Sequence, residues 1–301
     1  MSSKPKLLLH PDKWNNAVSP FLEPLFDEHF ERVFIDPSVT YNAKESIVYA
    51  NCEDTDWVIP WRDNQYKVVI DNLWESPMTN LPHGVNVINP DLWFFRANES
   101  LCYEYFGYDQ YTRVPNITKT FLMLMNLQRL HRDQIWEQIN LDNSIHSYVD
   151  RGTPLNHDDT ETTNGDWQRY FNPDWYNSTN FSMVVESTVV PEPLGVTEKT
   201  FKPIAFQHPF ILWGPAGYLN QLHDQGFCTF DHIIDESYNT EQDHATRLTM
   251  IIEQVNKIKD IKLTDTETVK RTMHNHNLFF DTQWSRHKFN ENLFQPMLEL
   301  L

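Results

Sequence analysis

Glycine and cysteine are both scarce in this chain. With only 8 glycines in 301 residues and many Asn and Asp, its loops are expected to turn at Asx residues, whose side chains hydrogen-bond to the nearby backbone. Cys52, Cys102 and Cys228 are odd in number and lack the spacing of metal ligands. We therefore expect three small core residues in a protein of a reducing, cytoplasmic compartment.

Long apolar runs are also missing. No stretch approaches the length of a membrane span, and the run at residues 7–9 is too short for the apolar region of a signal peptide. Hydrophobic residues nevertheless make up 40% of the chain, which is enough for a large core. The length of 301 residues accommodates two domains of ordinary size.

Positive charge is the third shortage. There are 24 Lys and Arg against 42 Asp and Glu, a formal net charge of -18, which argues against a broad nucleic-acid-binding face. In so acidic a chain, a local gathering of cations is informative. Two short windows contain such a set: Lys119, Arg129, Arg132, Lys199 and Lys202. The sequence predicts a local cationic pocket there, with solvated surface charges as the alternative.

Short apolar, β-branched segments alternate with helical or loop segments, a pattern typical of α/β domains. The expected strands are 6–9, 32–35, 46–49, 67–70, 85–88, 92–95, 121–125, 181–185, 210–213 and 230–234. A linker is expected near residues 113–116. We predict one α/β domain over 1–115, a second α/β domain over 116–262, and a helical tail over 263–301.

The segment 181–214 carries the clearest arrangement of candidate residues. Glu186 follows a buried strand, Thr197 is a plausible helix N-cap, and Lys199 falls in the first helical turn. Two strands joined through a helix should be parallel, and ligands of such sheets bind beyond the carboxyl ends of the strands. A helix N-terminus with a lysine at that edge suits a phosphate group.

Glu186 together with the run Thr197-Glu198-Lys199 resembles the donor-binding signature of α1,3-fucosyltransferases and related GT-B glycosyltransferases. The resemblance covers the C-terminal half. It implies two Rossmann-like domains facing a central cleft, a metal-independent reaction and a nucleotide-sugar donor. The resemblance makes 1–115 the acceptor-side domain and 116–262 the nucleotide-sugar-binding domain, with the 263–301 tail packing back across both. It also implies that Glu186 holds the ribose and Lys199 the diphosphate. Glu198 and Lys202 are further candidates for the same site. The alternative is that these residues only cap and solvate a helix.

A second window precedes this one. The expected strand 121–125 is followed by Asn126, Arg129 and Arg132, in a loop that we expect to end where Asp133 caps a helix. Arginines bind phosphate oxygens through charge-assisted, often bidentate hydrogen bonds. Cations at a helix N-terminus oppose the helix dipole, which suggests an anion between them. The same family resemblance places such a loop at the donor diphosphate.

The N-terminal half contains candidates for the general base that would activate an acceptor hydroxyl. Asp12, Asp71 and Glu75 follow expected strands, and His10 has the side chain type that titrates nearest neutrality. Each acid is equally well explained as a loop residue that caps backbone N–H groups. The Asp-x-Asp at residues 54–56 is a competing metal-binding pattern, but such short patterns are common by chance, and no metal or other cofactor is expected.

The sequence therefore predicts a hexosyl- or pentosyltransferase that moves a sugar from a nucleotide-sugar donor to a hydroxyl of a glycan or other acceptor. Inversion at the anomeric carbon follows from the family resemblance alone. Two alternatives stay open. One is a phage-type DNA glycosyltransferase that acts on hydroxymethylated bases, and the other is a non-catalytic nucleotide- or sugar-binding protein.

Overall fold

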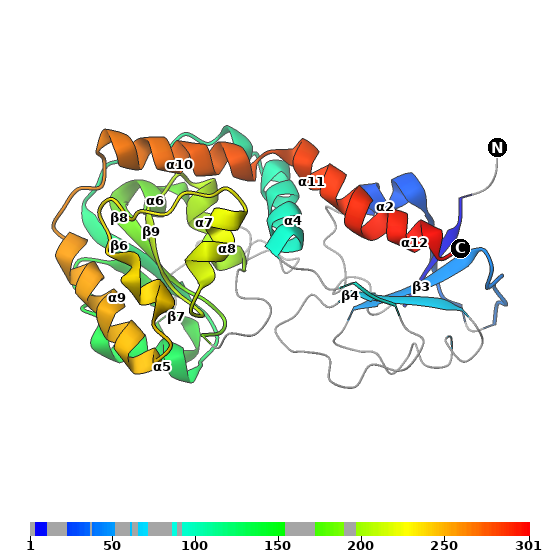
Figure 1. Ribbon diagram of the computed structural model, residues 1–301, viewed down its shortest axis with the longest axis horizontal. Helices are drawn as coiled ribbons and strands as arrows, with labels where there is room; N and C mark the ends of the chain where they lie inside the picture. The colour runs from blue at the N-terminus through cyan, green and yellow to red at the C-terminus, as the bar shows by residue number, and fades with distance from the viewer. Residues whose placement is uncertain are drawn as a thin grey trace. The chain divides into compact units, whose positions relative to one another are not determined.

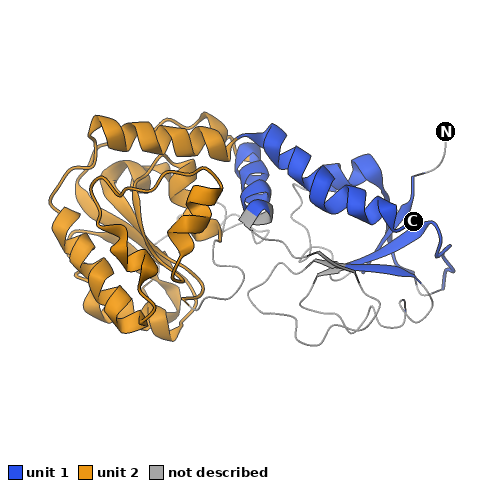
Figure 2. Cartoon of the chain, in the orientation of Figure 1, with its two compact units in different colours: residues 1–105, 281–301 blue, residues 106–280 orange. Residues whose placement is uncertain are grey.

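The computed structural model describes residues 4–10, 23–36, 38–51, 61, 66–71, 86–88, 92–153, 172–189 and 197–301. The chain divides into two compact units, one formed by residues 1–105 with 281–301 and the other by residues 106–280 (Figure 2). Each unit contains its own parallel β-sheet with helices. Both units are therefore Rossmann-like α/β structures, as the alternation of apolar segments predicts.

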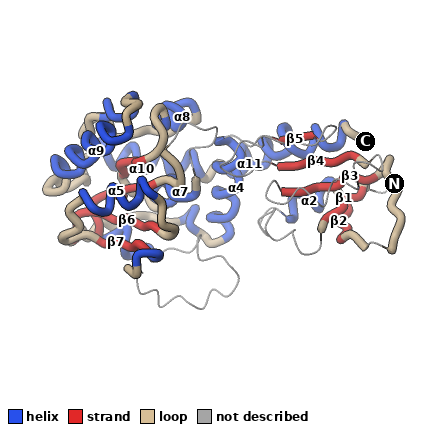
Figure 3. The backbone as a smooth tube through the Cα atoms, turned by 90° about the horizontal axis from the view of Figure 1, so that it is seen from below, coloured by secondary structure: helices blue, strands red, loops and turns tan. Residues whose placement is uncertain are grey.

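The first unit is built on a five-stranded sheet in the order β2-β1-β3-β4-β5, whose strands lie side by side in Figure 3. The strands are β1 (Lys6–Leu9), β2 (Glu31–Phe34), β3 (Ser46–Asn51), β4 (Lys67–Asp71) and β5 (Asn86–Ile88). Its helices are α2 (Glu23–His29), α4 (Leu92–Tyr105), α11 (Thr282–Phe289), a π-helical turn (Asn290–Phe294) and α12 (Gln295–Glu299). All pairings are parallel, and Leu8 of β1 aligns with Val33 and Val48.

The expected strand at 92–95 is wrong, because this segment begins α4. Its apolar residues continue at helical spacing: Ala97 and Leu101 are buried in the core of the first unit, and Trp93 packs against them. The same core contains Phe289 and Phe294 from the C-terminal segment. A run of three aromatic residues fits a buried strand and a helix equally well, and only the helical repeat that follows distinguishes the two.

The second unit has a four-stranded parallel sheet in the order β7-β6-β8-β9. Its strands are β6 (Lys119–Met125), β7 (Ile145–Tyr148), β8 (Thr179–Val185) and β9 (Phe210–Trp213). Its helices are α5 (Leu130–Gln138), α6 (Pro173–Ser178), α7 (Glu198–Ala205), α8 (Tyr218–Asp224), α9 (His244–Ile258) and α10 (Thr266–Phe279), with short 3-10 turns at Tyr108–Gln110, Val149–Arg151 and Glu236–Thr240. Helices cover both faces of this sheet, with α7 and α10 on one side and α5 and α9 on the other (Figure 1).

The strand expected at 230–234 is absent from the structure, where the segment is a tight turn. The carbonyl of Phe230 accepts hydrogen bonds from the N–H groups of Ile233 and Ile234, at 3.0 and 2.9 Å. Phe230 and Ile234 are buried, so their apolar character reflects packing under a turn rather than a place in the sheet.

The first unit ends at residue 105, before the linker expected at 113–116. The intervening residues bind to the second unit, since Arg113 donates to the carbonyls of Tyr176 and Thr179. The C-terminal segment is divided as well: Phe279 of α10 stacks on Phe201 of α7, whereas residues 281–301 belong to the first unit. Among the described residues, none of the helices combines the length and apolar character needed to cross a membrane.

Candidate functional site

The strand order of the second unit defines one place where a ligand is expected. β6 and β8 are neighbours, and the chain continues from β6 to β7 on one side and from β8 to β9 on the other. Ligands of such sheets bind at this switch point, beyond the carboxyl ends of the strands. Asn126 follows β6 and Glu186 follows β8. The tertiary structure thus brings both sequence windows to the same edge of one sheet. Lys119 is the exception, because it begins β6 and lies at the amino end of the strand, away from this edge.

Glu186 is the most buried acid of this edge, with 0% of its surface exposed. Its carboxylate accepts hydrogen bonds from Thr197 N at 3.3 Å, Thr197 Oγ1 at 2.5 Å and Thr200 Oγ1 at 2.5 Å. Thr197 in turn caps α7, because its side chain accepts from Lys199 N at 3.4 Å. The buried carboxylate therefore fixes the start of α7 against the end of β8.

Lys199 extends from the first turn of α7 over the same loop. Its ammonium group donates to Ser187 Oγ at 2.9 Å, Thr197 Oγ1 at 3.2 Å and Glu198 Oε1 at 2.7 Å. Burial by itself raises the pKa of Glu198, but Lys199 and Lys202 outweigh it and lower that pKa to about 2. Glu198 is therefore an anion at neutral pH, and it occupies a donor of Lys199 that a phosphate oxygen could take.

Three basic residues from the β6–α5 segment converge on the loop that contains Glu186 and Ser187. Arg129 NH1 donates to the Ser187 carbonyl at 2.8 Å, and His131 Nε2 lies 2.9 Å from the Glu186 carbonyl. Because a carbonyl oxygen only accepts, His131 Nε2 carries the proton. Arg132, which is 2% exposed, donates to the Leu127 carbonyl at 2.9 Å and reaches the Glu186 carbonyl at 3.5 Å.

The helix start in this segment differs from the expected one. Helix α5 begins at Leu130 with Arg129 at its N-cap, so Asp133 is not the cap. Asp133 instead accepts a hydrogen bond from Tyr148 OH at 2.8 Å and forms an ion pair with Arg151 at 2.8 Å. These bonds tie α5 to the end of β7. His131 and Arg132 consequently lie in the first helical turn, not in a loop.

The electrostatics of this edge favour an anion. Burial lowers the pKa of Arg132, and the neighbouring Arg129 lowers it further, as expected where cations crowd together in low dielectric. The edge has three cations, Arg129, Arg132 and Lys199. Its two carboxylates, Glu186 and Glu198, leave one positive charge in excess, while Lys202 lies in the last turn of α7. In a chain with a net charge of -18, this local excess of positive charge suits an anionic ligand.

Arg247 of α9 was missed by the motif-based reasoning, although it also contacts this loop. Its guanidinium donates to the Val189 carbonyl at 3.0 Å. A signal was present in the sequence, because Arg247 occupies a position of the buried stripe that continues with Ile251 and Val255. An arginine at a core-facing helical position is rare unless its charge has a partner.

The candidate bases belong to the first unit. His10 directly follows β1 and is half-buried, and Asp71 is the last residue of β4. Both positions are at the carboxyl ends of parallel strands. Asp12, Glu75 and the Asp-x-Asp at 54–56 lie outside the described residues. Within the described part of the chain, no three His, Cys, Asp or Glu side chains are arranged to hold a metal ion.

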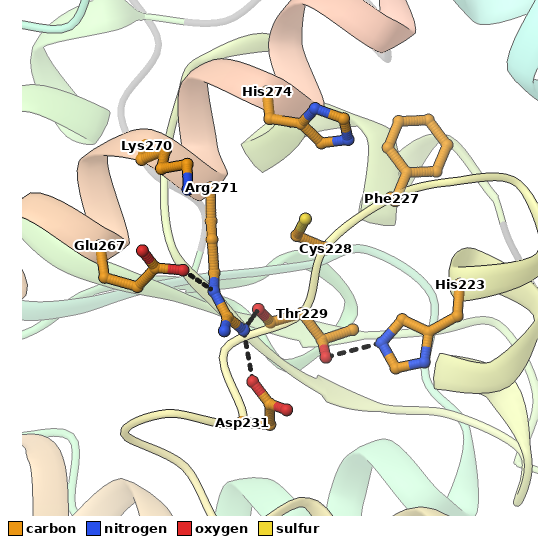
Figure 4. Close-up of a pocket in the computed structure, with 9 residues that line it drawn as sticks. All are labelled: His223, Phe227, Cys228, Thr229, Asp231, Glu267, Lys270, Arg271 and His274. Carbon is orange, nitrogen blue, oxygen red and sulfur yellow. Dashed lines mark hydrogen bonds and ion pairs between the residues drawn. The ribbon is translucent and has the colours of Figure 1, made fainter.

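A separate cavity of about 340 Å³ lies between α8, the 227–231 segment and α10 (Figure 4). Arg271 dominates it, donating to Glu267 Oε1 at 2.9 Å, to the Thr229 carbonyl at 2.8 Å and to Asp231. The two carboxylates match the charges of Arg271 and the neighbouring Lys270. This network joins the turn to α10 and offers no excess charge to a ligand, in contrast to the edge at β6 and β8.

Comparisons with known proteins add little to this geometry. No protein-family model matches the sequence, and no curated protein matches it either. One solved structure to which the chain is similar is described as "Crystal Structure of alpha1,3-Fucosyltransferase"; the two are 13% identical, the match covers 93% of this chain and 90% of that chain, and the TM-score is 0.44. A TM-score this low carries no argument about fold or activity.

Proposed function

We propose that this protein is a glycosyltransferase that uses a nucleotide sugar, with the donor bound at the edge formed by β6, β8 and α7. One observation supports the proposal above the others: Arg129, Arg132 and Lys199 gather at the topological switch point of an otherwise acidic chain. That position, a helix N-terminus and an excess of positive charge all suit the diphosphate of a nucleotide sugar. The proposed donor residues are Asn126, Arg129, Arg132, Glu186, Thr197, Glu198, Lys199 and Lys202.

The roles that we propose for these residues are supported by their contacts. Lys199 and Arg129 are half-buried and are proposed to bind the diphosphate, where their charges offset the negative charge that develops as the nucleoside diphosphate leaves. When the donor binds, the Lys199 ammonium exchanges its hydrogen bond to Glu198 for one to a phosphate oxygen. Glu186 is proposed to receive the ribose hydroxyls in exchange for one of its threonine hydroxyl donors, and otherwise to hold the start of α7.

The acceptor is proposed to be a hydroxyl of a glycan or similar molecule, activated by a base of the first unit. The candidates are His10, Asp12, Asp71 and Glu75. The base takes the hydroxyl proton while the oxygen bonds to the anomeric carbon and the nucleoside diphosphate departs with the electron pair. We propose inversion at that carbon, a reaction without metal, and a cytoplasmic enzyme.

A thermal-shift screen with nucleoside diphosphates and nucleotide sugars tests the donor site. A ligand at a hundred times its dissociation constant adds about 2.7 kcal/mol of stability, which raises the melting temperature measurably. The ligand that stabilises most is then incubated with glycan acceptors and, separately, with hydroxymethylated DNA, and the product is detected by mass spectrometry. Proton NMR of the product reports the anomeric configuration.

The outcomes separate the candidate functions. Transfer to a glycan supports the proposal, whereas transfer to DNA alone replaces it with the DNA glycosyltransferase. Binding without turnover on any acceptor identifies a nucleotide-binding protein. If no nucleoside diphosphate or nucleotide sugar stabilises the protein, the donor-site assignment is wrong.

A further inference from the structure

Arg247 makes an unusual set of contacts for a residue that is only 2% exposed. One terminal nitrogen donates to the Glu241 carbonyl at 2.7 Å, and the other donates to the Val189 carbonyl at 3.0 Å and to His244 Nδ1 at 2.8 Å. The guanidinium also lies 5.1 Å from the centre of the Trp213 ring. Arg247 therefore connects α9, the end of β9 and the loop that follows β8.

This contact completes a pattern along residues 186–189. The carbonyls of Glu186, Ser187 and Val189 all accept hydrogen bonds from basic side chains, which come from α5, its N-cap and α9. The N–H groups of Ser187 and Val189 have no hydrogen-bond partner among the described residues, although both residues are less than one-tenth exposed. Almost all buried backbone N–H groups are paired in native proteins, so a loop of this kind is suited to an external acceptor.

We propose that Arg247 is a positioning residue of the donor site, which sets the orientation of the 186–189 loop so that its free N–H groups and Lys199 face one anionic ligand. This inference rests on the proposed function, since it names the diphosphate as the group that the loop receives. Arg247 itself does not touch the ligand. It acts through the Val189 carbonyl, at the far end of the loop from the contacts of Arg129 and Arg132.

An arginine is suited to this task because its planar fork can bond to several acceptors at once and stays charged when buried. Here the Arg247 guanidinium donates to carbonyls of two separate segments, the loop at Val189 and the turn at Glu241. A lysine at the same position could carry the charge but could not reproduce this geometry. Burial lowers the pKa of Arg247, and its own contacts with backbone carbonyls keep the cation in place.

The test compares Arg247→Met and Arg247→Lys with Arg113→Met. Arg113 is a matched control, because it also donates to two backbone carbonyls, at 3.1 and 2.8 Å, but at the amino end of β8. Each variant is titrated by calorimetry with inorganic pyrophosphate, GDP and UDP. Its melting temperature is recorded, and hydrogen exchange is followed in peptides that span residues 186–189.

We expect Arg247→Met to weaken pyrophosphate binding about tenfold or more and to accelerate exchange in the loop, with Arg247→Lys intermediate. Arg113→Met should lower the melting temperature as much, with affinity and loop exchange unchanged. Equal losses of affinity in Arg113→Met and Arg247→Met at equal melting temperatures would make the role merely structural and overturn the inference. If the wild type binds none of the three probes, the proposed function fails, and loop exchange that is unaffected in both Arg247 variants would still refute the positioning role.

Discussion

Replacing Lys199 with alanine is the sharpest test of the donor site. In the structure the Lys199 ammonium donates to Ser187, Thr197 and Glu198. The helix-dipole argument alone predicts that removing a cation from the first turn of α7 slightly stabilises the protein. In the structure the substitution also removes the ion pair between Lys199 and Glu198. We therefore expect a small loss of stability instead of a gain.

The two effects of the substitution differ in size. The side chains of Lys199 and Glu198 are 19% and 25% exposed, and pairs close to the surface contribute only about 0–1 kcal/mol. The melting temperature should therefore fall by a few degrees at most. A charge-assisted hydrogen bond to a phosphate oxygen is worth about 1.5–3 kcal/mol, so the affinity for a nucleoside diphosphate should fall roughly ten- to a hundredfold.

Calorimetric titration with pyrophosphate and GDP measures this loss. Lys257→Ala, an exposed lysine of α9, is the control for the change in net charge and should leave both affinities intact. Glu198→Gln should act in the opposite direction with pyrophosphate, because it frees one N–H of Lys199 from a competing carboxylate. If Lys199→Ala binds both ligands as tightly as the wild type, Lys199 does not bind the diphosphate.

Three further results are expected. Glu186→Gln should lower the melting temperature by several degrees, because the new amide nitrogen cannot accept the hydrogen bonds that Thr197 and Thr200 donate to the carboxylate. Each buried donor left without an acceptor costs about 1–3 kcal/mol. An unchanged melting curve would contradict this prediction. His208 is 1% exposed, and burial lowers its pKa well below the ordinary value, so the unfolded chain takes up a proton first as the pH falls below about 6.5. Stability to urea should then drop by up to about 1.4 kcal/mol per pH unit, and His208→Gln should flatten that slope; an equal slope in both proteins would exclude His208 as the cause. Finally, transferase activity should survive EDTA, and a loss that manganese restores would instead identify a metal-dependent enzyme.

Local patterns in the sequence were sufficient for the elements that carry the candidate site. Residues 210–213 form a strand as expected, Glu186 follows a strand whose residues are all buried, and Thr197 caps α7 with its side chain. These features depend on neighbours within a few residues, such as a β-branched run or a hydroxyl two positions before a free N–H. They could therefore be predicted without knowledge of the rest of the fold.

Local patterns failed where one residue pattern fits two structures. The apolar run at 92–95 begins a helix, whose core-facing side includes Trp93, Ala97 and Leu101 at helical spacing. The buried residues Phe230 and Ile234 belong to a turn. Burial was predicted correctly for Phe230 and Ile234 although their secondary structure was not, since burial is a property of packing and not of the backbone conformation that achieves it.

Only the tertiary structure decided which charges meet. The sequence alone determined that basic residues occur in two windows of an acidic chain, but the parallel pairing of β6 with β8 brings Arg129, Arg132 and Lys199 to one edge of the sheet. The contact of Arg247 with the Val189 carbonyl joins residues far apart in the chain, and no local pattern encodes it. The physical reason is that a buried cation takes whichever acceptor the folded backbone presents, and that acceptor exists only after the sheet has assembled.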